Sequence, residues 1–99
     1  MIVIWSPLAE ARAREAVEYI AQERPQAAAA WLEQLLERTA TLDRFAKRGR
    51  VVEEIGHPAY RELLHAPYRV IYRVDPTRVV ILTLRHSRRA WDDSEVGGV

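Results

Sequence analysis

The chain has 99 residues, enough for one small domain, and its hydrophobic content of 48% excludes an intrinsically disordered protein. It has no cysteine, which excludes disulfides, thiol catalysis and cysteine-based zinc sites. The net charge of +1 conceals a gradient, because residues 57–91 carry seven Lys/Arg against two Asp/Glu, whereas residues 1–43 carry four against seven. A basic region of this kind attracts nucleic acid or an acidic protein segment.

Targeting and ligand signals are missing from the sequence. No apolar run is long enough to cross a membrane, and the first residues lack the basic start and the cleavage site of a signal peptide. We therefore expect a cytoplasmic protein with no membrane partner. The three histidines are far apart and have no carboxylates at metal-ligand spacing, so we expect no metal and no cofactor.

The first half of the chain predicts a strand followed by two helices. Ile2–Trp5 is an apolar strand, and Ser6–Pro7 has the pattern of an N-cap with proline in the first helical turn. The first helix is expected to end at about Glu23. Arg24–Pro25 breaks the first helix, and apolar residues spaced three and four apart predict a second helix that begins at Pro25 and ends at about Phe45. Helices joined so tightly form an antiparallel hairpin.

The second half predicts a small sheet. A basic loop leads to a stretch that begins in extended form at Val51, and three strands follow, at 60–65, 68–74 and from Val79 onward. The short link at 75–78 makes the last two strands an antiparallel hairpin. The predicted fold is therefore α+β, with an N-terminal strand and an antiparallel helical hairpin packed on a small antiparallel sheet in the order β-α-α-β-β-β.

Residues 1–91 are expected to form a single domain, and the acidic residues 92–99 a flexible tail. Within the domain, arginines stand inside predicted strands, and alternation along 68–74 places Arg69 and Arg73 on one face. We expect this face to be open and to bind an acidic partner, with the core on the opposite face. The candidate binding residues are Arg61, Arg69, Arg73, Arg85, Arg88, Arg89 and Trp91.

Two candidate residues have alternative interpretations. Arg69 can clamp a phosphate or a partner carboxylate, or it can pair internally with Glu62 or with the C-terminal acids. His86 is the best candidate for proton transfer because imidazole titrates near neutral pH. Its alternation with Leu84, however, directs it toward the core, where a hydrogen-bonded structural histidine is expected.

The stretch YRELLHAPYRVIYRV at 60–74, with the ending RHSRR at 85–89, resembles the RelE/ParE superfamily of toxins from type II toxin–antitoxin systems. The resemblance extends from Ile2 to about Trp91. It implies a small cytoplasmic toxin and a cognate antitoxin that wraps around it. It also implies that the toxin–antitoxin complex binds operator DNA, mostly through the antitoxin.

The superfamily contains branches with different activities. One branch cuts mRNA on the ribosome, and the ParE branch poisons DNA gyrase without a known hydrolytic site. The nuclease branch typically has two lysines on the strand before the Tyr-Arg-Val strand and a catalytic tyrosine near the C-terminus. Here Arg61 and Leu63 stand at the lysine positions, and Trp91 is the aromatic residue nearest to the tyrosine position. We therefore favour a ParE-like toxin that poisons DNA gyrase.

Two alternatives remain open. The first is a ribosome-dependent mRNA endoribonuclease, since a related nuclease subgroup uses a glutamate, an arginine and a histidine. Glu54 (or its neighbour Glu53), Arg69 and His86 would fill these catalytic roles. The second is a non-toxic remnant that only binds its antitoxin.

Overall fold

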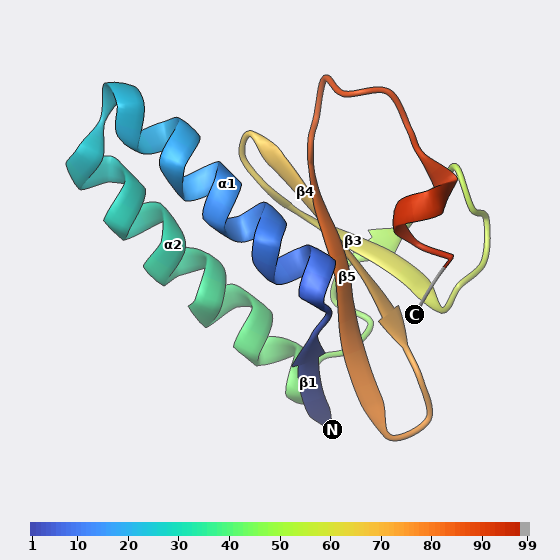
Figure 1. Ribbon diagram of the computed structural model, residues 1–99. Helices are drawn as coiled ribbons and strands as arrows, with labels where there is room; N and C mark the ends of the chain where they lie inside the picture. Colours follow the sequence, from blue (N-terminus) through green and yellow to red (C-terminus); the bar gives the residue numbers. More distant parts are fainter. Residues whose placement is uncertain (98–99) are drawn as a thin grey trace.

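The computed structural model describes residues 1–97 and confirms the predicted α+β fold. Figure 1 shows the helical hairpin packed beside a twisted sheet. Gly98 and Val99, the end of the predicted tail, lie outside the described residues. The elements are β1 (Ile2–Trp5), α1 (Pro7–Glu23), α2 (Pro25–Ala40), a 3-10 turn (Thr41–Asp43), β2 (Arg50–Val51), β3 (Tyr60–His65), β4 (Tyr68–Val74), β5 (Arg78–His86) and a second 3-10 turn (Asp93–Glu95).

In the described part of the chain, five strands form one sheet in the order β1-β5-β4-β3-β2. The strands pair antiparallel except that β1 runs parallel to β5, with Ile2 beside Arg78 and Trp5 beside Ile81. The predicted sheet is thus confirmed as mostly antiparallel. The strand β2, of which the sequence indicated only an extended start, pairs with β3 and forms the far edge.

The start of α1 is fixed by Ser6, as predicted. Its Oγ accepts a hydrogen bond from the Ala9 backbone N–H at 3.0 Å and donates to the Leu82 carbonyl oxygen at 2.8 Å. The N-cap therefore also ties the helix to β5. Ala9, Ala13 and Ala16 are buried, so α1 can lie close to its neighbours.

The helix α2 ends at Ala40, five residues before the predicted end at Phe45. The chain tightens into a 3-10 turn, in which the Thr41 hydroxyl donates to the Arg38 carbonyl oxygen at 2.7 Å. Leu42 in this turn is still buried. The turn continues the apolar spacing of the helix, which is why the sequence pattern placed the helix end too late.

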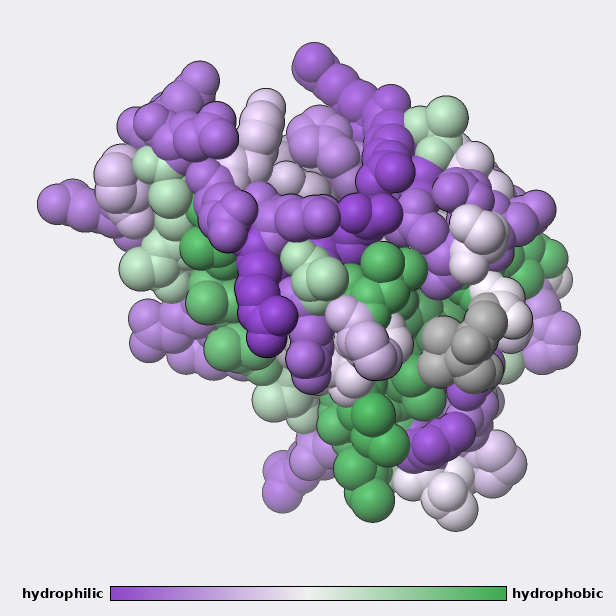
Figure 2. All heavy atoms as spheres, in the orientation of Figure 1, coloured by the Kyte–Doolittle hydropathy of each residue, from purple (hydrophilic) through white to green (hydrophobic). Residues whose placement is uncertain are grey.

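Both faces of the sheet are covered, so the expectation of an open face is wrong. The helical hairpin packs on one face, over a core that includes Val70 and Leu84. On the other face Ile71 and Leu82 pack with Val96 from the C-terminal segment. In the orientation of Figure 2, apolar side chains gather around β1 and the lower part of β5, and polar ones cover the upper part.

A β-bulge explains part of this difference. Ile71 pairs with Thr83 and Tyr72 pairs with Ile81, so Leu82 is an extra residue in β5. The bulge reverses the alternation of side chains in the second half of the strand. Leu84 therefore lies on the helix side rather than with Leu82. The described residues include no helix that is both long and apolar enough to span a membrane.

Candidate functional site

The strand arginine Arg69 is held by two carboxylates on the non-helical face of the sheet. Its Nε and Nη2 donate to Glu62 at 2.7 and 2.9 Å, and its Nη1 and Nη2 donate to Glu54 at 2.8 Å. The guanidinium carbon also lies 5.3 Å from the ring centroid of Trp91. Every nitrogen of this guanidinium therefore donates to an internal carboxylate, which is the second of the two interpretations of Arg69.

The electrostatics of this cluster favour its fully charged state. The hydrogen bonds from Arg69 lower the pKa of Glu54 to about 2, although desolvation opposes the shift. The hydrogen bonds from Glu54 and Glu62 raise the pKa of Arg69. Glu62 is only 3% exposed and has a second cation, Arg50, at 3.6 Å. An incoming phosphate would have to displace one of these carboxylates before it could bind Arg69.

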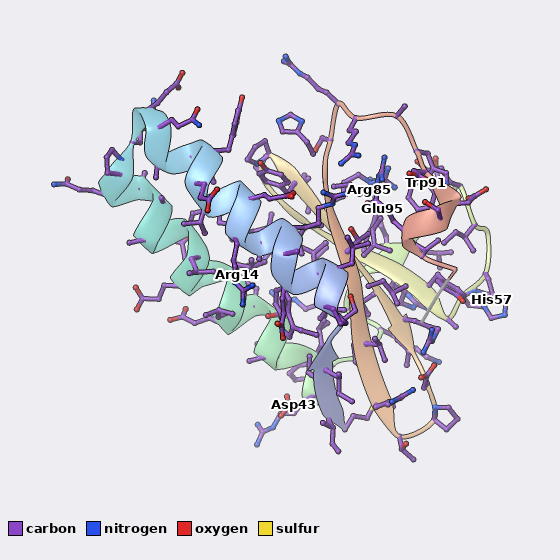
Figure 3. All side chains as sticks on the ribbon, viewed as in Figure 1. Arg14, Asp43, His57, Arg85, Trp91 and Glu95 are labelled. Atoms are coloured by element: carbon purple, nitrogen blue, oxygen red, sulfur yellow. The ribbon has the colours of Figure 1, made fainter. Side chains whose placement is uncertain are left out.

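Arg85 forms a second buried ion pair beside the first. It is 1% exposed, and its guanidinium donates to Glu95 and to the Ala90 carbonyl oxygen. Glu95 also accepts from the Thr83 hydroxyl at 2.8 Å. Figure 3 shows Arg85, Glu95 and Trp91 close together between β5 and the C-terminal segment. Arg85 is thus surrounded by the protein itself and is closed to a partner in this arrangement.

The C-terminal segment covers the non-helical face of the sheet. Residues 92–97, which were expected to belong to a flexible tail, pack against the sheet, with Glu95 and Val96 each 6% exposed. Hydrogen bonds from Ser94 to Asp92 shape the turn and lower the pKa of Asp92. The sequence offered the C-terminal acids as possible partners of Arg69, but the acid that docks, Glu95, pairs with Arg85 of the preceding strand β5.

Two further strand arginines also have internal partners. Arg61 donates to the carbonyl oxygens of Pro58 at 2.9 Å and Gly49 at 3.0 Å. Arg73 pairs with Asp75 at 2.7 Å, and this hydrogen bond raises the pKa of Arg73 and lowers the pKa of Asp75. These side chains organise loops at the lower end of the sheet.

The last two candidate arginines, Arg88 and Arg89, are exposed in the loop after β5. The Arg89 guanidinium lies 3.9 Å from Glu95, at the limit of an ion pair. Of the seven candidate binding residues, these two arginines are the ones that present most of their charge to solvent.

The three residues proposed for catalysis are not brought together. Arg69 and Glu54 are in contact, but His86 lies on the helical face, where its ring meets the ring of Tyr68 edge-on at a centroid distance of 5.4 Å. His86 lines a pocket of about 280 Å³ beside α1, together with Arg12. Among residues 1–97, no three His, Asp or Glu side chains are grouped so that they could hold a metal ion.

The structure also exposes a feature that the sequence pattern hid. Phe45 was assigned to the end of the second helix because it continues the apolar spacing, yet it stands in a loop and is 62% exposed. We call residues 44–50 the Phe45 loop. The available signal was an aromatic residue in a run of four basic residues with no acidic residue among them.

Comparison with known proteins finds one matching family and a similar solved structure. The family described as "ParE toxin of type II toxin-antitoxin system, parDE" matches residues 3–91. Among solved structures, a chain of the "Chromosomal ParDE TA system from P. aeruginosa" superposes with a TM-score of 0.72 at 21% identity, covering 87% of this chain and 95% of that one. At this identity the second likeness concerns the fold alone. No curated protein sequence matches the chain.

Proposed function

The chain belongs to the ParE toxin family of type II toxin–antitoxin systems, and from this premise we propose that it inhibits growth by poisoning DNA gyrase and that a cognate antitoxin neutralises it. The proposal places its action in the cytoplasm. It includes operator DNA as a partner of the toxin–antitoxin complex, bound through the antitoxin.

One observation carries the choice of a binding inhibitor over a nuclease. General acid–base cleavage of RNA needs a proton-transfer group and a free cation around one phosphate. Here the cation Arg69 is saturated by Glu54 and Glu62, and the candidate proton-transfer group His86 lies on the other face of the sheet. This arrangement supports a toxin that acts by binding.

A site for the antitoxin is supported by the surface of the helical hairpin. A groove of about 400 Å³ is lined by Trp5, Ala13 and Leu36, and Leu36 is 50% exposed. A second groove of about 260 Å³ is lined by Val17 and Leu32. An amphipathic helix places apolar side chains into grooves of this kind. We propose that the antitoxin binds along the hairpin.

The test compares two targets with one purified toxin. We expect the wild type to inhibit DNA supercoiling by gyrase or to trap cleaved DNA on gyrase, and to leave ribosome-bound mRNA intact. The variant His86→Gln is expected to inhibit gyrase as the wild type does. Ribosome-dependent mRNA cuts that disappear in His86→Gln would instead establish the nuclease alternative and overturn the gyrase proposal.

A further inference from the structure

Three of the four basic residues of the Phe45 loop have no carboxylate partner among the described residues, and the fourth, Arg50, lies 3.6 Å from Glu62. Within residues 1–97 no carboxylate lies within 4.0 Å of the side-chain nitrogens of Arg44, Lys47 or Arg48. Arg48 donates to the Thr41 hydroxyl at 3.0 Å, which leaves its charge uncompensated. Most strand arginines are neutralised internally, whereas this loop holds, within the five consecutive residues 44–48, three cations without a carboxylate partner in the described part of the chain.

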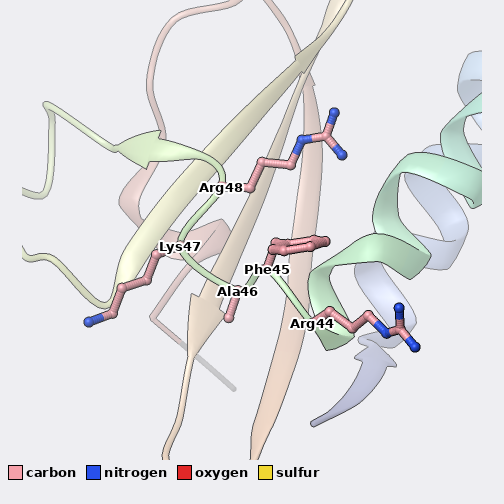
Figure 4. A pocket seen from close by; sticks show the side chains of 5 residues that line it. All are labelled: Arg44, Phe45, Ala46, Lys47 and Arg48. Atoms are coloured by element: carbon pink, nitrogen blue, oxygen red, sulfur yellow. The ribbon is translucent and has the colours of Figure 1, made fainter.

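The loop also presents an apolar anchor. Phe45 lines an open groove of about 710 Å³ together with its neighbours in the loop. Figure 4 shows its ring between the side chains of Arg44 and Arg48, with Lys47 directed away. Binding hot spots in protein interfaces commonly consist of an aromatic side chain surrounded by a polar or charged rim. A single exposed aromatic is a weaker basis for binding nucleic acid, which needs successive stacking surfaces.

The backbone of the loop is fixed before any partner arrives. The buried Tyr72 hydroxyl accepts a hydrogen bond from the Gly49 backbone N–H and donates to the Ala46 carbonyl oxygen, both at 2.8 Å. Arg61 donates to the Gly49 carbonyl oxygen at 3.0 Å. A Cβ atom at Gly49 would lie 2.5 Å from the Glu62 carbonyl oxygen, so only glycine fits this close approach. A loop held in this way loses little conformational entropy on binding.

We propose that the Phe45 loop is a docking site for an acidic segment of the antitoxin that carries an apolar side chain beside its carboxylates. The apolar side chain packs on Phe45, and the carboxylates pair with Arg44, Lys47 and Arg48. The loop follows α2 after one 3-10 turn, so a partner in the groove at Leu36 is placed to continue onto it. This inference rests on the proposed function and adds a second contact to it.

The experiment measures the affinity of purified toxin variants for the product of the gene adjacent to the toxin gene. We expect Phe45→Ala to weaken binding about tenfold or more, and Phe45→Leu, which keeps an apolar side chain, to weaken it less. We expect Lys47→Glu to weaken binding about tenfold at low salt, with a difference that shrinks as salt is added. Circular dichroism checks that each variant is folded.

Matched controls separate this loop from the rest of the surface. Leu64→Ala removes an apolar side chain of similar exposure, 58%, from β3, and Arg78→Glu reverses a partly exposed charge at the start of β5, so both controls lie away from the helical hairpin. Both controls are expected to bind as the wild type does, within about twofold. Equal losses in the controls and in the loop variants would overturn the assignment to the loop.

The remaining outcomes distinguish this inference from the proposed function. Loop variants that bind the antitoxin normally would overturn the inference and leave the proposed function intact. Loop variants that keep antitoxin affinity but no longer inhibit gyrase, or that only lose binding to single-stranded RNA, would assign the loop to another partner and also overturn it. A wild type that binds no product of an adjacent gene would overturn both proposals.

Discussion

Replacing Arg69 by alanine distinguishes a structural arginine from one that binds a partner. The substitution leaves the carboxylate of Glu62, which is 3% exposed, with Arg50 at 3.6 Å as its nearest cation. Removing one partner of a buried ion pair costs about 3–5 kcal/mol. Glu54 has a side chain that is 34% exposed, so it regains water and adds little. We therefore expect Arg69→Ala to lower the free energy of unfolding by about 3 kcal/mol.

For a domain of this size, each kcal/mol shifts Tm by about 4–8 °C, so the expected decrease in Tm is about 12–24 °C. Chemical denaturation and thermal melting measure these values, with Arg88→Ala as the exposed control, expected within about 0.5 kcal/mol of the wild type. Adding Glu62→Gln to Arg69→Ala removes the stranded charge and is expected to recover part of the loss. An unchanged Tm in Arg69→Ala would refute the reasoning and would return Arg69 to the role of a free binding residue.

Three further predictions concern stability. The pKa of Glu54 is lowered from 4.5 to about 2, so its ionised carboxylate stabilises the fold above about pH 4.5 and this stabilisation is lost as the pH falls toward 2. Glu54→Gln should therefore be less stable than the wild type at pH 7 by roughly 1 kcal/mol or less. The free energies of unfolding of the two proteins, measured by denaturation, should converge near pH 2. A gap that persists at pH 2 would contradict this. Glu95→Ala strands the buried Arg85 and should cost about 3 kcal/mol by denaturant titration, whereas a loss below about 1 kcal/mol would mean that the C-terminal segment is not docked. Ser6→Ala removes the N-cap of α1 and the hydrogen bond to the Leu82 carbonyl oxygen, so urea unfolding should show a loss of about 1–3 kcal/mol. No change would count against the role of Ser6.

The sequence determined those features that depend on local chemistry. Ser6–Pro7 fixed the start of α1, the apolar spacing predicted both helices, and the strict alternation along 68–74 identified β4 and its neighbours. N-capping, helical periodicity and strand alternation act over a few residues, so they can be read without knowing the fold. The same local patterns in 60–74 and 85–89 carried the resemblance to the RelE/ParE superfamily, and the family match over residues 3–91 bears it out.

Only the tertiary structure decided the faces and the charge partners. The extra residue Leu82 reverses the alternation in β5, and no sequence pattern marks a bulge inside an apolar strand. The sequence left Glu62 and the C-terminal acids open as internal partners of Arg69, and only the packing assigns Glu62 and Glu54 to Arg69 and Glu95 to Arg85. The sheet face that carries Arg69 and Arg85 was predicted to be open, but the C-terminal segment covers it. An arginine in a strand shows only that a charge must be satisfied, and the packing around it determines whether a carboxylate of the same chain or of a partner satisfies it.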